Sequence, residues 1–268
     1  SKFFQLGNKQ LVHAVDDVSL DIAAEEVVGL VGESGSGKTT FGKTLIGLYD
    51  KTGGEVSFRG KTLPERYLAE DFKAQAEHIQ IVFQDPYSSL NPRMTVFEII
   101  AEGLLIRDKA SLSSTRDKVV YWLERVGLHA DHLSRYPHEF SGGQRQRVGI
   151  ARALAMQPKV LLMDEPFGAL DALTRAHLQD SLMEIQTDLN STIIMITHDV
   201  DEAVLLSDRI VMMTNGPAAK IGEILEINLP RPRNRVEMSD NAEYNHYRHE
   251  VLAFLYEKQR NPADKRAA

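Results

Sequence analysis

Three short runs of apolar residues dominate the hydrophobic pattern, at Glu26 to Val31, Val160 to Met163 and Thr192 to Thr197. Each run is flanked by positions with helical periodicity. Continuous apolar strands of this length are typical of parallel sheets that are covered by helices on both faces. The pattern therefore predicts an α/β fold built on a parallel sheet.

Between about Asp85 and Val148 the pattern changes to helical periodicity, for example over Val96 to Ile106 and Arg116 to Val126, and no strand run interrupts it. A long stretch of this kind between two strands predicts a helical subdomain that is inserted into the core.

The ends of the chain have other patterns. Alternation over Ala14 to Ile22 and Glu55 to Phe58 predicts a small flanking antiparallel sheet. Leu229 to Arg235 is rich in turn-forming residues and predicts a linker, followed by an amphipathic helix with apolar positions at Tyr247, Val251, Phe254 and Leu255. These changes divide the chain into four regions: the first part of the core with the antiparallel sheet (1–84), the helical subdomain (85–148), the second part of the core (149–230), and the linker with the C-terminal helix (231–268).

Composition is typical of a soluble globular protein, with 31 Lys and Arg, 38 Asp and Glu, a net charge of −7 and 43% hydrophobic residues. An acidic chain is a poor candidate for nonspecific DNA binding. The absence of cysteine excludes disulfides, thiolate metal ligands and a cysteine nucleophile. No apolar window approaches the length of a membrane span, and no secretory signal precedes the fold, so we expect neither membrane insertion nor export. The start at Ser1 suggests processing or a removed tag.

Residues Gly32 to Thr39 match the pattern G-x-x-x-x-G-K-[ST], directly after a predicted strand and before a predicted helix at Thr40 to Leu48. Glycines let backbone N–H groups converge on phosphate oxygens, and the helix N-terminus adds a partial positive charge. Lys38 is expected to reach the β and γ phosphates, and Thr39 to offer a hydroxyl to Mg²⁺. An ordinary glycine-rich turn is the alternative. The predicted nucleotide contacts are Gly32, Ser34, Gly35, Ser36, Gly37, Lys38, Thr39 and Thr40.

Two carboxylates, Asp164 and Glu165, follow the second apolar run, at the strand edge where open α/β sheets bind ligands. Asp164 is predicted to hold Mg²⁺ directly or through water, and Glu165 to polarise the water that attacks the γ-phosphate. The alternative is a pair of acidic residues at a helix start, which Pro166 would suit.

The residues Ser141, Gly142, Gly143 and Gln144 precede a predicted helix, Arg145 to Met156, and form a capping box with Ser141 as the cap. A cap does not explain two glycines, which weaken a first helical turn by roughly 1 kcal/mol each. A helix N-terminus without side chains can bind an anion, so it is a candidate for a second phosphate-recognition element.

With Phe140 in front, this segment resembles the signature of ABC-type ATPases. The other motifs of that family are matched by Gln84 (Q-loop), by Ala169 to Asp171 (D-loop) and by His198, the switch histidine. The resemblance covers essentially the whole chain and implies a P-loop NTPase core of the RecA-like kind. It further implies that two copies pair head to tail and enclose ATP between the phosphate loop of one and the signature of the other. In this family Gln84 would sense Mg²⁺ and water, and His198 would contact the γ-phosphate.

The resemblance also implies partners and a location. We expect ATP and Mg²⁺ as cofactors, a homodimer or heterodimer of ATP-binding subunits, and transmembrane permease subunits of an importer. The chain would be cytoplasmic and peripheral at the inner face of the membrane, without nucleic acid as a partner. Two other readings remain open. One is a soluble ABC protein that acts on DNA or ribosomes, which the short interval from Lys38 to Ser141 disfavours. The other is an engineered domain that binds ATP without coupling to transport.

The resemblance differs along the chain. The N-terminal part, including GLVGESGSGKTT and YPHEFSGGQRQR, looks like oligopeptide or dipeptide importer ATPases. From about Ala155 the sequence, including QPKVLLMDEPFGALDALTR, looks like nitrate or sulfonate importer ATPases. This suggests a recombined chain with a junction between about Gly142 and Gln157, and a natural divergent importer ATPase is the alternative.

Other residues are less specific. Phe4 is the candidate for stacking on adenine, as an aromatic residue before the first core strand commonly does in this family, with Phe3 and His13 nearby. A Phe that packs in the core is the alternative. Trp122 is predicted to be buried, and Arg145 and Arg147 to lie on a solvated helix face. Solvated positions are expected for the remaining histidines that were considered as metal ligands: His129, His132, His138, His246 and His249.

Overall fold

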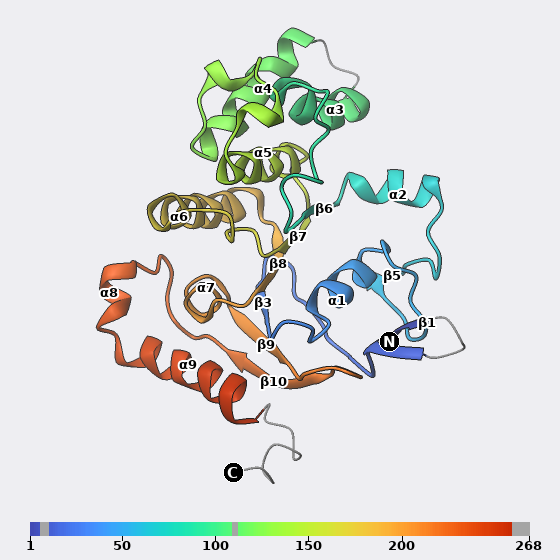
Figure 1. Ribbon diagram of the computed structural model, residues 1–268, viewed down its shortest axis with the longest axis vertical. Helices are drawn as coiled ribbons and strands as arrows, with labels where there is room; N and C mark the ends of the chain where they lie inside the picture. Colours follow the sequence, from blue (N-terminus) through green and yellow to red (C-terminus); the bar gives the residue numbers. More distant parts are fainter. Residues whose placement is uncertain (6–10, 109–111, 259–268) are drawn as a thin grey trace. The chain divides into compact units, whose positions relative to one another are not determined.

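The computed structural model describes residues 1–5, 11–108 and 112–258 (Figure 1). The chain forms two compact units, residues 1–71 with 194–268, and residues 72–193. The division into four regions predicted from the sequence is finer than these two units and stays a prediction. Residues 259–268 of its last region lie outside the described residues. No helix in the described ranges combines the length and the apolar character needed to cross a membrane.

The first unit is built around β3 (Val27–Val31), whose residues are all buried. This strand pairs in parallel with β9 (Arg209–Met213), and β8 (Thr192–Thr197), most of which belongs to this unit, follows β3 in the strand order. On the other side of β9 lies β10 (Ile221–Glu226), and this pair is antiparallel. The predicted parallel pairing is confirmed for β3 with β9, and β10 adds an antiparallel strand that the pattern did not predict. The residues of β10 alternate between half-buried and exposed, which is typical of a strand with one solvated face.

The described residues of this unit contain four complete helices. They are α1 (Lys38–Leu45), α7 (Val200–Leu206), α8 (Arg235–Ser239) and α9 (Ala242–Ala253), and α9 continues into a π-helical turn at Phe254–Lys258. The predicted C-terminal helix is thus confirmed, although it begins earlier than its apolar pattern indicated. Its positions Tyr247, Val251 and Phe254 are buried.

Two small sheets flank the core of the first unit. One pairs β1 (Lys2–Gln5) with β2 (Leu11–Val15), and the other pairs β4 (Ser57–Phe58) with β5 (Lys61–Thr62), both antiparallel. The flanking antiparallel strands are confirmed, but the strand predicted over Ala14 to Ile22 ends at Val15. Asp17 has a φ of 49°, a left-handed conformation that a strand cannot continue through.

In the second unit β6 (Ile79–Val82) and β7 (Val160–Asp164) pair in parallel. Between them the described residues contain helices and no strand, as predicted. The helices are α3 (Val96–Asp108), α4 (Leu112–Arg125) and α5 (Gly142–Ala155), with short 3₁₀ turns at Ala130–His132 and Pro137–Glu139. These three helices pack on one another, and Trp122 is buried among them as predicted. The unit also contains α6 (Ala172–Leu189), and α2 (Ala69–Ala76) runs from the first unit into it.

Candidate nucleotide-binding site

The phosphate loop connects β3 to α1 in the first unit. Gly37, at the start of α1, has a φ of 80°, which glycine adopts without strain. A Cβ at this position would lie 2.7 Å from the carbonyl oxygen of Ala14, so only glycine fits. Ser36 is fully buried, whereas Glu33, Ser34 and Gly35 at the tip of the loop are exposed. The loop therefore has a rigid base and an open tip.

Lys38 is buried under this loop. Its Nζ donates hydrogen bonds to the carbonyl oxygens of Gly32 (2.6 Å) and Glu33 (2.8 Å) and to Ser36 Oγ (3.3 Å). A buried ammonium needs such partners, because leaving water without them would be costly. The same three donors can turn to phosphate oxygens, which are stronger acceptors because they are charged.

A second loop, after β9, supports the tip of the phosphate loop. Asn215 Nδ2 donates to Glu33 Oε2 at 2.7 Å, and a Cβ at Gly216 would lie 3.1 Å from the carbonyl oxygen of Gly35. The sequence analysis did not select these residues. The Asn-Gly-Pro sequence at 215–217 signalled a turn, but no local pattern connects a turn to a loop so far away in the sequence.

The acidic strand end lies in the second unit. Asp164 is 3% exposed at the end of β7, and Glu165 follows with a φ of 47°. A non-glycine residue in this left-handed region is strained, and such strain is often found at functional sites. The Glu165 carboxylate accepts a hydrogen bond from Gln84 Nε2 at 2.9 Å. Two residues predicted to act on the attacking water are thus brought together.

The predicted capping box is confirmed at the start of α5. Ser141 Oγ accepts from the backbone N–H of Gln144 at 3.2 Å, and Gln144 Oε1 accepts from the backbone N–H of Ser141 at 2.9 Å. The two glycines between them differ. A Cβ at Gly143 would lie 3.0 Å from the carbonyl oxygen of Ala169 and 3.0 Å from Leu170 Cδ2, whereas one at Gly142 would meet nothing closer than 3.9 Å. Gly143 is therefore needed for packing, and Gly142 is not.

This difference gives a prediction for stability. We expect Gly143→Ala to lower the free energy of unfolding by about 1–3 kcal/mol, because the Ala169 backbone must move to admit the methyl group. The matched variant Gly142→Ala should unfold at an unchanged or slightly higher temperature, since alanine favours the helix. Thermal unfolding followed by circular dichroism measures both. Equal effects of the two substitutions would contradict the packing argument.

Arg145 and Arg147 do not form a solvated helix face, so that prediction is wrong. Arg145 is 8% exposed, donates from Nε to the carbonyl oxygen of Pro137 at 2.6 Å, and lies over the ring of Tyr87 at 3.8 Å from its centroid. Arg147 Nη1 donates to the carbonyl oxygen of Gly127 at 2.6 Å, and burial lowers the pKa of its guanidinium. Helical periodicity could not reveal this, because the acceptors are loop carbonyls.

The remaining predicted residues have these positions. Asp171 caps α6 by accepting from the backbone N–H of Thr174 at 3.0 Å, and this hydrogen bond lowers the pKa of its carboxyl. His198 is exposed directly after β8.

The half-buried Phe4 packs edge-on against Tyr49, with ring centroids 5.5 Å apart. His129, His138, His246 and His249 are exposed, as expected, and His132 is half-buried.

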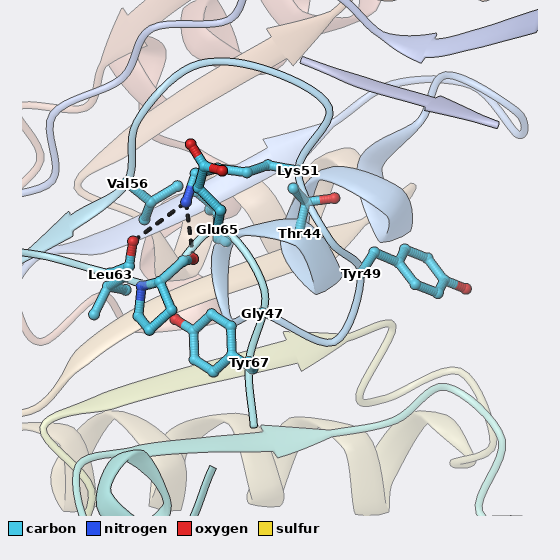
Figure 2. A pocket seen from close by; sticks show the side chains of 10 residues that line it. Thr44, Gly47, Tyr49, Lys51, Val56, Leu63, Glu65 and Tyr67 are labelled. Carbon is cyan, nitrogen blue, oxygen red and sulfur yellow. Dashed lines mark hydrogen bonds between the residues drawn. The ribbon is translucent and has the colours of Figure 1, made fainter. Parts of the chain in front are cut away.

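A small hollow in the first unit lies beside α1 and is lined by residues such as Thr44, Gly47 and Tyr67 (Figure 2). The basic group at its edge, Lys51, donates to the carbonyl oxygens of Leu63 (3.2 Å) and Pro64 (2.8 Å), as Figure 2 shows. None of the predicted nucleotide contacts lines this hollow. The residues predicted to bind the nucleotide therefore lie in the motif loops and not in the hollow beside α1.

A phosphate loop between a buried parallel strand and a helix defines the class of this α/β protein as a P-loop nucleotide-binding protein. The family model described as ABC transporter matches residues 15–168, more than half of the chain, and the chain belongs to this family. It is an ATP-binding ATPase of the ABC type.

Several relatives are similar over most of the chain. The nitrate transport protein NasD of Klebsiella oxytoca is 52% identical over 92% of this chain and 90% of its own length. The oligopeptide transport ATP-binding protein OppF of Bacillus subtilis is 46% identical over 81% of this chain and 71% of its own length. The dimeric ATP-binding cassette MJ0796, in a post-hydrolysis state bound to ADP and Pi, is 29% identical, with a TM-score of 0.78, over 85% of this chain and 97% of its own.

These matches bear on the idea of a recombined chain. NasD matches across the suggested junction between about Gly142 and Gln157 and covers nearly the whole chain. OppF also matches over a stretch that is too long to stop at that junction. The chimera hypothesis is therefore not supported.

Proposed function

We propose that this chain is the ATP-hydrolysing subunit of an ABC importer and works as a head-to-tail pair. The observation that carries the proposal is the start of α5. There the capping box uses the N–H groups of Ser141 and Gln144, and the two residues between them, Gly142 and Gly143, carry no side chain. This end can receive a phosphate. The chain thus has two phosphate-binding elements, and the second would serve the ATP held by its partner. The names of NasD and OppF, a nitrate and an oligopeptide transport protein, support the assignment to a transporter.

Within the pair, the phosphate loop from Gly32 to Thr40 would hold the triphosphate, and Phe4 would stack on adenine. The signature residues 141–144 and Asp171 of the other copy would close the site. The transmembrane permease subunits would bind at the inner face of the membrane.

The residues assigned to Mg²⁺ offer suitable donors. Thr39 has a hydroxyl, Asp164 a carboxylate and Gln84 an amide oxygen, and Mg²⁺ prefers such hard oxygen ligands. When bound, the ion would neutralise the charge that develops on the phosphates. Glu165 would act as the general base towards the attacking water, held in place by Gln84 at 2.9 Å. His198 would contact the γ-phosphate.

A mixing experiment tests the paired arrangement. Lys38→Ala should inactivate the phosphate loop, and Ser141→Arg should block the signature. We expect each variant alone to be inactive. An equimolar mixture should recover about a quarter of the wild-type rate, because about half of the dimers are mixed and each of these has one intact site of two.

Dilution of the wild-type chain provides a second readout. When the chain is diluted below the dimer dissociation constant, the ATPase rate per molecule should decrease. Sedimentation of the same samples should show that the chain becomes monomeric over the same range of concentration. A monomer that hydrolyses ATP at the full rate, together with a mixture that stays inactive, would overturn the proposal.

A further inference from the structure

The segment after β10 contacts both ends of α7, the helix that begins two residues after His198. Three of the side chains that make these contacts are Arg233, Tyr244 and Arg248, which we call the C-terminal clamp. The short helix has only two turns, and such a helix depends on tertiary contacts for its position. All of these residues belong to the first unit.

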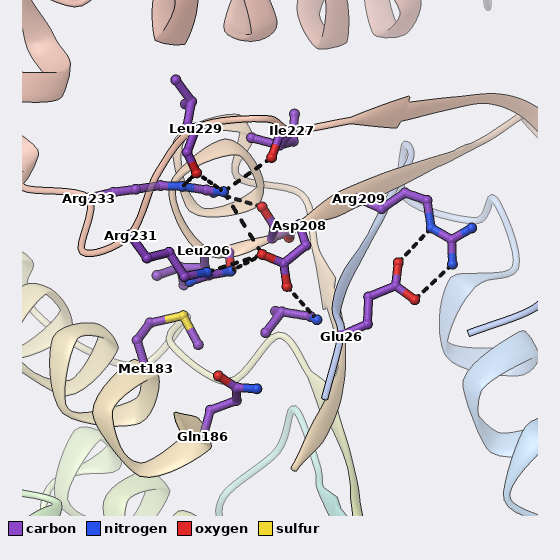
Figure 3. A network of polar contacts seen from close by, with 12 residues as sticks. Glu26, Met183, Gln186, Leu206, Asp208, Arg209, Ile227, Leu229, Arg231 and Arg233 are labelled. Atoms are coloured by element: carbon purple, nitrogen blue, oxygen red, sulfur yellow. Dashed lines mark hydrogen bonds and ion pairs between the residues drawn. The ribbon is translucent and has the colours of Figure 1, made fainter. Parts of the chain in front are cut away.

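At the C-terminal end of α7, the clamp acts through a buried guanidinium. Arg233 Nη1 donates to the carbonyl oxygens of Val204 (2.8 Å), Leu205 (3.2 Å) and Ser207 (2.7 Å). Figure 3 shows the same guanidinium directed at the carbonyl oxygens of Leu229 and Ile227. A cation at this end complements the helix dipole and satisfies carbonyls that have no partner within the helix.

Arg233 keeps its charge despite burial. Burial lowers its pKa to about 10, which is still well above neutral pH. The neighbouring Arg231 pairs with Asp208 at 2.8 Å (Figure 3), and Asp208 Oδ2 accepts from the backbone N–H of Val27 at the start of β3. The end of α7 is therefore fixed to the core strand as well as to the linker.

At the N-terminal end of α7, the clamp acts through Asp201. Tyr244 Oη donates to Asp201 Oδ1 at 3.1 Å, and Arg248 Nε lies 2.5 Å from the same oxygen. Burial of the Tyr244 hydroxyl, with the charge of Asp201 beside it, raises the pKa of this phenol. The hydroxyl thus remains a donor over the whole physiological range.

A closed set of hydrogen bonds connects the first turn of α7 to the two residues that flank the switch histidine. Thr197 Oγ1 donates to Glu202 Oε2 at 2.7 Å and accepts from the backbone N–H of Asp199 at 3.0 Å. Asp199 Oδ1 in turn accepts from the backbone N–H of Glu202 at 3.1 Å. His198 is the exposed residue in the middle of this set. We therefore expect a displacement of the first turn of α7 to displace the backbone that carries its imidazole.

We propose that the C-terminal clamp positions His198 for ATP hydrolysis by holding both ends of α7. Tyr244 and Arg248 are then positioning residues, which act through Asp201 and touch no substrate. This inference rests on the proposed role of His198. It predicts an effect on turnover that is much larger than the effect on ATP binding or stability.

The test uses the full chain with Tyr244→Phe and Arg248→Met combined, which removes the polar contacts to Asp201 and keeps the ring and the aliphatic stem. We expect kcat to fall about 5- to 20-fold, because the clamp and His198 are energetically coupled. KM for ATP should change less than about twofold, because neither residue touches the nucleotide. The control Arg125→Met removes another arginine that pairs with an aspartate, Asp188 at 3.2 Å, and should leave kcat unchanged.

A double-mutant cycle separates positioning from general stability. In a His198→Ala background, measured by single-turnover release of labelled phosphate, the same two substitutions should lower the rate less than about twofold, since no imidazole is left to position. An equal loss in both backgrounds would overturn the inference and leave the proposed function intact. Full turnover by His198→Ala itself would instead overturn the role of His198 and the inference with it.

Two further variants keep the test decisive. If the combined variant does not fold, Tyr244→Phe alone removes one hydroxyl, and its cycle with His198→Ala must show the same coupling. Arg248→Lys keeps a positive charge for Asp201 but loses the two-point contact of the guanidinium, so with Tyr244 intact it should lose less kcat than Arg248→Met does. Loss of activity in this conservative variant equal to the loss in Arg248→Met would contradict a role through the ion pair with Asp201.

Discussion

We expect Glu165→Gln to hydrolyse ATP about 10²–10⁴-fold more slowly than the wild type, while it still binds ATP and favours the closed dimer. The substitution removes the basic carboxylate but keeps the shape of the side chain. Gln84 Nε2 donates to Glu165 Oε2 at 2.9 Å, and the amide oxygen of the glutamine can accept the same hydrogen bond. The strained backbone at this position, with a φ of 47°, is also unaffected by the exchange.

Phosphate release under steady-state conditions measures the loss, and equilibrium binding of labelled ATP shows whether the nucleotide is retained. A matched control is Glu184→Gln, the same chemical change at a side chain on α6 that is 74% exposed. The control should keep wild-type turnover. Wild-type turnover by Glu165→Gln would show that another group activates the water.

Three core strands, β3, β7 and β8, could be predicted because nearly all of their residues are buried, whereas β9, which is buried to a similar extent, was not predicted. The run from Thr192 to Thr197 coincides with β8, and Val160 to Met163 falls within β7. Burial on both faces leaves a continuous apolar signal that no local turn can imitate. The capping box at Ser141 and Gln144 was predictable for a similar reason, because its two hydrogen bonds join residues only three positions apart.

Contacts between distant segments could not be predicted in this way. Arg145 has the spacing of a residue on a polar helix face, yet its guanidinium lies under the turn that precedes the helix. Asn215 supports Glu33 across 182 positions, and Arg233 reaches three carbonyls at the end of α7. Arginine and asparagine on loops carry no periodicity, so a single sequence does not indicate which backbone they will contact.

The second large effect concerns Lys38, whose buried Nζ has three partners within the phosphate loop, Gly32, Glu33 and Ser36. We expect Lys38→Ala to weaken ATP binding by about 30- to 1000-fold, since charge-assisted hydrogen bonds to phosphate contribute about 2–4 kcal/mol. The loop also loses the hydrogen bonds that hold it in shape without nucleotide. The free energy of unfolding should therefore decrease in the absence of ATP as well.

Isothermal titration with ATP and Mg²⁺ measures the affinity, and thermal unfolding without nucleotide measures the contribution to the loop. Lys43→Ala is the matched control, because it removes the same charge from the last turn of the same helix. It should bind ATP within about threefold of the wild type, as expected for a half-buried charge outside the phosphate loop. The two measurements distinguish the roles of Lys38. A loss of stability with unchanged ATP affinity would show that Lys38 only supports the structure of the loop. A loss of ATP affinity with unchanged stability would show that water replaces its contacts to the loop carbonyls at no cost in free energy.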